Sequence, residues 1–182
     1  HHRCMVAEVM GRHVGWIALH SGIAAGAHVI CIPEVPMSID EITAQVQKAH
    51  DRGRAPLVVV SEGFTLTGMD EAYSDKGLDA FNRPRLGGIS EILAPEIERI
   101  TGIETRATVL GHIQRGGSPS AFDRVLATRL GLHAADVVAE EAWGQMVSLK
   151  GTDIVRVPFE DALGELNTVP LYRYEEAAAL FG

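Results

Sequence analysis

Side chains suited to a phosphorylated sugar follow three segments that we predict to be β-strands. The three groups are Met10-Gly11-Arg12, Ser61-Glu62-Gly63, and the run 111–117, which contains His112 and Arg115. Ligands of open parallel sheets bind beyond the carboxyl ends of the strands, so we expect the groups to meet at one edge. One arginine can bind two phosphate oxygens at once, carboxylates accept hydrogen bonds from sugar hydroxyls, and glycine lets the backbone approach a ligand. The pattern therefore predicts a site for a polyol phosphate.

Each of these residues, taken alone, also fits a structural role. An arginine after a strand is usually a solvated surface residue, and a lone histidine is more often a hydrogen-bonded part of the structure. Glu62 alone fits a loop charge, and Gly116-Gly117 alone fits a turn. The joint position of these residues after successive strands favours a binding site.

Strand and helix patterns alternate along the chain, and a polar, glycine-bearing loop is predicted at 64–87. A capping box, Ser38 with Glu41, opens one of the helices, and Ser118-Pro119 is predicted to open another. The order predicts an α/β fold with a mainly parallel, Rossmann-like sheet and helices on both faces. We predict strands at 4–9, 28–32, 57–60 and 105–110, helices at 11–25, 39–52, 90–100, 119–142 and 175–180, and a hairpin of 146–149 with 154–157.

We expect two parts in the chain. Residues 1–145 are predicted to form a sugar-phosphate-binding α/β domain that is truncated at its amino end. Residues 146–182 are predicted to form a C-terminal hairpin and helix that pack on the rest of the protein. The chain begins with His1 rather than Met and enters a strand almost at once, which we interpret as a truncation.

Composition excludes several classes of protein. The net charge of −8, from 16 basic and 24 acidic residues, argues against a nucleic-acid partner. No signal peptide and no apolar stretch of bilayer length occur, so we expect no membrane partner. Cys4 and Cys31 lie in apolar runs, which is typical of reduced core residues in a cytoplasmic protein. No C-x-x-C or H-E-x-x-H pattern occurs, so we predict no metal ligands in this chain.

The segment 105–117, TRATVLGHIQRGG, resembles the signature of the 6-phosphofructokinase family, and the resemblance continues to Asp123-Arg124. Residues 8–12, EVMGR, resemble a second block of that family, and Pro33-Glu34 and Ser61-Glu62-Gly63 also fall where the family has them. The resemblance covers nearly the whole chain, but only the carboxyl-side, fructose 6-phosphate-binding half of a full-length member. The pair Gly15-Trp16 makes the chain similar in style to actinobacterial members that use ATP or pyrophosphate.

The resemblance implies an activity. The full-length protein would transfer a phosphoryl group from ATP or pyrophosphate to the 1-hydroxyl of fructose 6-phosphate in glycolysis, with Mg²⁺ as cofactor. Arg12 and Arg115 would stabilise the charge of the transition state. The family's donor loop, magnesium ligands and aspartate base would lie before Arg3, so the resemblance implies that this chain alone is inactive.

The resemblance also implies roles in substrate binding. Met10, Gly11 and Arg12 would line the fructose 6-phosphate site, and Glu62 would bind sugar hydroxyls. His112 and Arg115 would contact the substrate near its 6-phosphate. Arg3 and Arg106 match arginines that members contribute across a subunit interface, which implies a homo-oligomer, dimer or tetramer, with a shared active site.

Two alternatives to this interpretation stay open from the sequence. One is a non-catalytic phosphosugar-binding regulatory domain. The other is a generic nucleotide-binding domain, but that class needs G-x-G-x-x-G between a strand and a helix, and the spacing of Gly11 and Gly15 differs from it. The identity of the donor, the effectors and the oligomer size are also left open.

Overall fold

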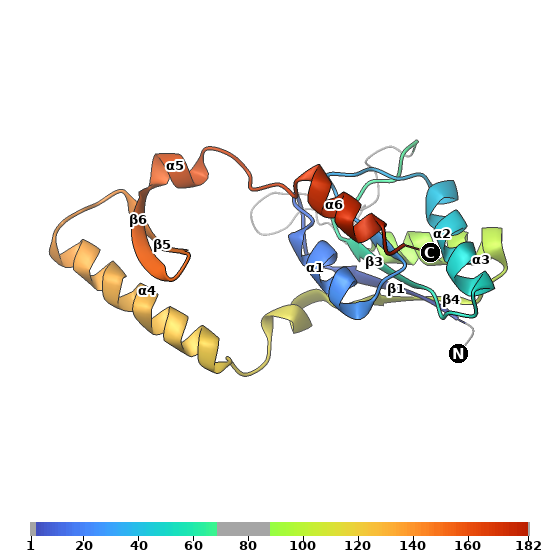
Figure 1. The fold of residues 1–182 in the computed structure, drawn as a ribbon, viewed down its shortest axis with the longest axis horizontal. Coiled ribbons are helices and arrows are strands. Elements are labelled where there is room, and N and C mark those ends of the chain that lie inside the picture. Colours follow the sequence, from blue (N-terminus) through green and yellow to red (C-terminus); the bar gives the residue numbers. More distant parts are fainter. Residues whose placement is uncertain (1–2, 69–87, 182) are drawn as a thin grey trace. The chain divides into compact units, whose positions relative to one another are not determined.

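A computed structural model describes residues 3–68 and 88–181, and the chain divides into two compact units (Figure 1). Unit 1 comprises His1–Arg115 and Thr168–Gly182, and unit 2 comprises Gly116–Asn167. Unit 1 is therefore built from both ends of the chain. The predicted division into residues 1–145 and 146–182 differs from these bounds and stays a prediction.

Unit 1 contains a four-stranded parallel sheet in the order β2-β3-β1-β4. In the register of the sheet, Val9 lies beside Ser61, and Glu8 lies beside Val109. The carboxyl ends of three adjacent strands therefore coincide at one edge. The strands are β1 (Cys4–Val9), β2 (Val29–Cys31), β3 (Leu57–Ser61) and β4 (Thr105–Val109).

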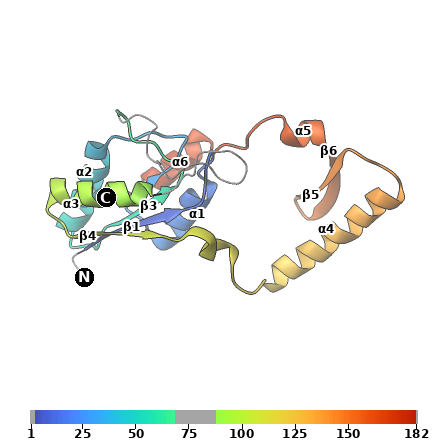
Figure 2. The ribbon, with the colours of Figure 1, turned by 180° about the vertical axis from the view of Figure 1, so that it is seen from behind.

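Helices cover both faces of this sheet, which Figures 1 and 2 show from opposite sides. One buried cluster joins Val58 and Val60 of β3 to Ile42 and Leu93, while the other joins Val59 to residues of α1 and α6. Alternate residues of β3 thus face opposite layers, as the period of a strand requires. The helices of unit 1 are α1 (Trp16–Ala25), α2 (Ile39–Asp51), α3 (Ile89–Thr101) and α6 (Leu171–Ala178). The α/β class with helices on both faces is confirmed.

Two predicted helix starts are wrong. The helix predicted from residue 11 begins at Trp16, and residues 10–15 form a loop in which Gly11 has a φ of 141°. The helix predicted from Pro119 begins after Ser120, whose hydroxyl and amide form a capping box with Asp123. The capping box predicted at Ser38 is confirmed.

A third helix start and one helix end are also wrong. Helix α4 ends at Ala139, before Glu141 with its φ of 54°, and α6 begins after Pro170 rather than at residue 175. Most of the predicted loop at 64–87 lies outside the described residues. Cys4 and Cys31 are free and buried, as predicted, and burial raises the pKa of the Cys4 thiol to about 12.

Unit 2 consists of one long helix, a hairpin and a short helix. The predicted hairpin is confirmed, with Lys150 paired to Asp153 and Gly151 at φ 63° in its turn. The elements of this unit are α4 (Ala121–Ala139), β5 (Gln145–Lys150), β6 (Asp153–Pro158) and α5 (Phe159–Leu163).

We expect unit 2 to open much more readily than unit 1. All of its residues are described, and only Val137 is buried, while Phe122 and Trp143 are each 67% exposed and Leu163 is 78% exposed. A helix and a two-stranded hairpin with so little buried apolar surface are marginally stable. Amide hydrogen exchange followed by mass spectrometry should show protection at least ~100-fold lower in unit 2 than in β1 and β3. Equal protection in the two units would contradict this expectation.

Candidate functional site

Three loops leave the carboxyl edge of the sheet side by side, because β1 lies between β3 and β4. The first loop, residues 10–15, follows β1, and Glu62-Gly63 follows β3. The 3₁₀ helix η1 (Gly111–Arg115) follows β4. Hydrogen bonds extend the sheet into these loops: the Glu62 amide donates to the Val9 carbonyl at 2.9 Å, and the Leu110 amide donates to the Glu8 carbonyl at 3.0 Å.

Gly11 joins the first loop to the loop after β3. Its amide donates to Glu62 Oε1 at 3.4 Å, and its carbonyl accepts from the Ser61 hydroxyl at 2.5 Å and from the Gly63 amide at 3.0 Å. A β-carbon on Gly11 would lie 2.4 Å from Ser61 Oγ, at a φ of 141° that other residues rarely adopt. Only glycine therefore fits this position.

Gln114 joins the first loop to η1. Its Oε1 accepts a hydrogen bond from the Met10 amide at 3.1 Å, and its Nε2 donates to the Gly111 carbonyl at 3.0 Å. The same short helix carries His112 and Arg115, whose side chains are exposed. Sequence reasoning missed Gln114, although its place between His112 and Arg115 was a signal for it.

The structure thus brings six of the eight predicted site residues to one edge of the sheet. Direct contacts join Gly11 to Glu62 and Met10 to η1, and the half-buried Arg12 follows Gly11 on the first loop. The loops at this edge therefore carry two guanidinium groups, an imidazole and a carboxylate on closely packed backbone. The six residues are Met10, Gly11, Arg12, Glu62, His112 and Arg115.

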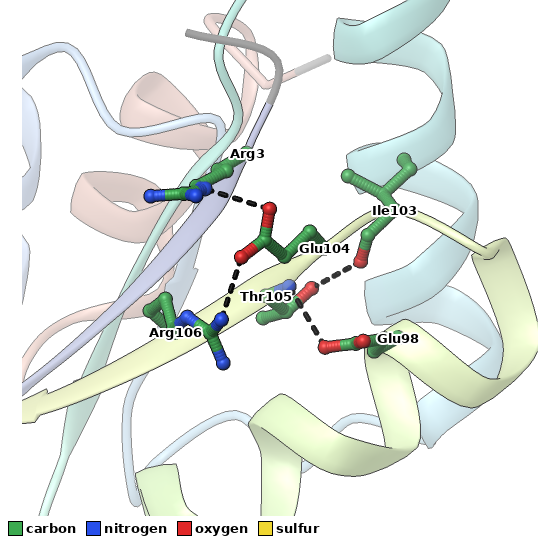
Figure 3. A network of polar contacts seen from close by, with 6 residues as sticks. All are labelled: Arg3, Glu98, Ile103, Glu104, Thr105 and Arg106. Carbon is green, nitrogen blue, oxygen red and sulfur yellow. Dashed lines mark hydrogen bonds and ion pairs between the residues drawn. The ribbon is translucent and has the colours of Figure 1, made fainter.

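Arg3 and Arg106 lie at the opposite edge, where β1 and β4 begin (Figure 3). Glu104 holds both: Oε2 accepts from Arg3 Nε at 2.7 Å, and Oε1 accepts from Arg106 at 2.6 Å. Hydrogen bonding from Arg3, with the positive charges of Arg3 and Arg106, keeps the pKa of the Glu104 carboxyl below its usual value. The structure therefore does not place these two arginines with the other six residues, and the sequence did not indicate Glu104 as their partner.

A buried carboxylate anchors the strand that carries the first loop. Glu8, two residues before Met10, is 2% exposed. Its carboxylate accepts from the Gly88 amide at 2.8 Å and from the amide and hydroxyl of Ser90 at 2.9 and 2.8 Å. These donors form the amino end of α3, so a single carboxylate ties β1 to that helix. Sequence reasoning assigned no role to Glu8.

Among the described residues, no group of three His, Cys, Asp or Glu residues could hold a metal ion. None of the described helices is both long enough and apolar enough to cross a membrane.

The parallel sheet and its two helical layers define an α/β protein, and the polar loops lie at the edge where ligands of such sheets bind. Residues 1–138 match the family model described as Phosphofructokinase. The chain belongs to the phosphofructokinase family.

Named relatives match the chain from end to end. A pyrophosphate–fructose 6-phosphate 1-phosphotransferase of Amycolatopsis mediterranei is 54% identical over 182 residues, which is 100% of this chain and 53% of that protein. An ATP-dependent 6-phosphofructokinase of Mycobacterium tuberculosis is 49% identical over 183 residues, again covering 100% of this chain and 53% of the relative. The chain therefore spans about half the length of the curated relatives it matches.

Solved structures show the same fold. The phosphofructokinase of Pichia pastoris in the T-state superposes with a TM-score of 0.68 and 32% identity, covering 100% of this chain and 20% of that chain. A pyrophosphate-dependent phosphofructokinase from Marinobacter aquaeolei superposes with a TM-score of 0.73 over 93% of this chain and 42% of that chain. At 23% identity, the second match supports the fold alone.

Proposed function

We propose that this chain is the fructose 6-phosphate-binding part of a cytoplasmic 6-phosphofructokinase, which makes fructose 1,6-bisphosphate in glycolysis. The proposal is supported by the position of Arg12, Glu62, His112 and Arg115 on loops that follow three adjacent strands of a phosphofructokinase-family chain. The names of its relatives include both ATP-dependent and pyrophosphate-dependent enzymes, so the donor is proposed as either of these two phosphates.

Each group at this edge has a proposed role that follows from its chemistry. Glu62, oriented by the Gly11 amide, accepts hydrogen bonds from sugar hydroxyls. His112 and Arg115 contact the 6-phosphate, and Arg12 and Arg115 offset the negative charge of the phosphoryl group in transit. Phosphoryl transfer depends mainly on such positioning and charge neutralisation. The 1-hydroxyl gives its proton to a base that we do not place among these residues.

The two remaining arginines are proposed to serve a neighbouring copy of the chain. Arg3 precedes β1 and Met10 follows it, and six extended residues span about 20 Å. That distance exceeds the length of a sugar phosphate, so Arg3 and Arg106 do not share a ligand with the carboxyl edge of their own chain, and we propose that they reach a phosphate bound at that edge of another protomer. A homo-oligomer, dimer or tetramer, with a shared active site follows from this proposal.

Magnesium is proposed as the cofactor of the full-length enzyme, but the described residues do not fit the ion. They offer no cluster of three acidic or imidazole groups, and the Glu62 carboxylate accepts a hydrogen bond from the Gly11 amide. Its ligands would belong to the half of the relatives that this chain does not match. None of the roles assigned to these residues therefore involves the metal.

Calorimetric titration of the 182-residue chain with fructose 6-phosphate tests the proposal. We expect weak binding, with a Kd on the order of 1 mM, and none of fructose, which lacks the phosphate. Arg115→Ala and Glu62→Gln should each weaken binding at least ~10-fold, because each removes a charged hydrogen-bonding group from the site. Arg99→Ala, which removes an exposed arginine from α3, should leave it unchanged.

Three results would count against the proposal. Binding of fructose as tight as that of fructose 6-phosphate would show that the edge does not recognise a phosphate. Normal turnover of this chain alone in a coupled fructose 1,6-bisphosphate assay would refute its assignment as the substrate-binding part. Specific binding without any turnover, even after the full-length enzyme is assembled, would instead support a regulatory phosphosugar-binding domain.

A further inference from the structure

One carboxylate, that of Glu34, holds two segments that are far apart in the sequence. Its Oε1 accepts a hydrogen bond from the Gly15 amide at 3.0 Å and another from the Val169 amide at 2.9 Å. Its Oε2 also lies 3.0 Å from the Gly15 nitrogen. The first donor ends the loop of residues 10–15, and the second belongs to the return segment, defined here as residues 168–181.

The first loop is fixed at two points. Near its start, the Gly11 amide donates to Glu62, and at its end the Gly15 amide donates to Glu34. Gly15 has no side chain that could cap helix α1. The Glu34 carboxylate, which binds the Gly15 amide, instead supplies a negative charge at the amino end of this helix. A β-carbon on Gly15 would lie 2.3 Å from Cβ of Ile32, which shows how closely the loop is pressed onto the chain after β2. The position of Glu34 therefore sets where the loop ends.

The return segment packs on the same layer of unit 1. Val169, Tyr174 and Ala177 are at most 7% exposed and share a buried cluster with Leu19 and Ile30. The Tyr174 hydroxyl donates to the Ile30 carbonyl at 3.0 Å. Apolar burial thus holds the segment against α1 and β2, and the Val169 amide brings one hydrogen-bond donor to Glu34.

We infer that docking of the return segment positions the first loop through Glu34, and that the segment thereby sets the affinity of the carboxyl edge for its phosphorylated ligand. The part about affinity rests on the function proposed above. A carboxylate oriented by donors from two segments loses part of its orientation when either donor leaves, so each contact strengthens the other. Such coupling is reciprocal: a ligand that orders the first loop strengthens docking of the return segment by the same factor.

Amide hydrogen exchange of three variants, followed by nuclear magnetic resonance, tests the coupling without any ligand. Glu34→Gln removes the negative charge and replaces the second oxygen near the Gly15 nitrogen by an NH₂ donor, so the remaining amide oxygen holds the two backbone amides less firmly than the carboxylate does. We expect exchange at Gly11, Gly15 and residues 171–178 to become ~10-fold faster, while exchange at β3 stays the same. Tyr174→Phe should also speed exchange at Gly11 and Gly15. The Tyr174 hydroxyl bonds the Ile30 carbonyl and Met37 Sδ rather than Glu34, so its effect on the first loop would pass through the return segment.

Glu98→Gln is the matched control. The Glu98 carboxylate also accepts a hydrogen bond from a backbone amide of unit 1, that of Thr105, at 3.1 Å. This bond involves neither the first loop nor the return segment. Exchange in both should be unchanged in this variant. The inference is overturned if Tyr174→Phe loosens the return segment while exchange at Gly11 and Gly15 stays within twofold of the parent chain.

Titration of the same variants with fructose 6-phosphate separates this inference from the proposed function. Glu34→Gln and Tyr174→Phe should each weaken binding ~5–10-fold, whereas Glu98→Gln should not. If the parent chain binds no fructose 6-phosphate, the proposed function fails while the exchange data still decide the coupling. If the parent chain binds and both variants bind equally well, the control of affinity by the return segment is refuted.

Discussion

Replacing Glu8 by alanine should lower the free energy of unfolding of unit 1 by about 3–5 kcal/mol, a large part of the stability of a typical domain. The substitution leaves the Gly88 amide and both donors of Ser90 without their acceptor in a site where the carboxylate is 2% exposed. Buried donors without partners are costly because water cannot replace the lost bonds. Urea unfolding followed by circular dichroism, with the m-value compared between proteins, measures the change.

Unit 1 contains a matched control for this prediction. Glu41 makes the same kind of bonds to a serine, accepting from the Ser38 amide at 2.7 Å and from its hydroxyl at 2.8 Å, but on the surface. Glu41→Ala should cost only about 0.5–2 kcal/mol, as expected of an exposed cap. Similar losses for Glu8→Ala and Glu41→Ala would show that burial of the Glu8 carboxylate adds nothing to its contribution.

Gly63→Ala should separate the loops after β1 and β3 and weaken fructose 6-phosphate binding by more than ~10-fold. A β-carbon at this position would lie 1.9 Å from the carbonyl oxygen of Arg12 and 2.9 Å from that of Gly11. Backbone atoms cannot yield as a flexible side chain does, so the two loops must move apart, at a cost of about 1–3 kcal/mol. Calorimetric titration and thermal unfolding of the variant measure the two effects.

Gly131→Ala serves as the control for this substitution. A β-carbon on Gly131 meets no atom within 4 Å, and the residue lies inside α4, where alanine is the better helix former. The affinity for fructose 6-phosphate should not change in this variant. An unchanged affinity in Gly63→Ala as well would mean that the close contact between the two loops has no part in the site.

The sequence predicted the elements of unit 1 well wherever the signals were local. The run at 57–60 is apolar throughout, and β3 is accordingly packed on both faces. Helix α2 begins where Ser38 and Glu41 predicted, because both halves of a capping box lie within one turn of helix. Helix α1 was misplaced because its start depends on Glu34, which lies 19 residues away in the chain.

The sequence predicted which residues belong to the candidate site better than it predicted how they are arranged. Arg12, Glu62 and Arg115 could be singled out because each follows an apolar run. The strand order that sets β1 between β3 and β4 arises from long-range pairing, and no local pattern encodes it. For the same reason Gln114 escaped notice, since its partner, the Met10 amide, lies 104 residues away.

The division of unit 1 between the two ends of the chain has a consequence for folding during synthesis. Val169, Tyr174 and Ala177 complete a hydrophobic cluster whose other members were made before unit 2. At the usual rate of about 5–20 residues per second, the ribosome needs roughly 3–10 s to add the intervening segment. During that interval the apolar faces of α1 and β2 lack their final cover, and the nascent chain presents a hydrophobic patch that chaperones can bind.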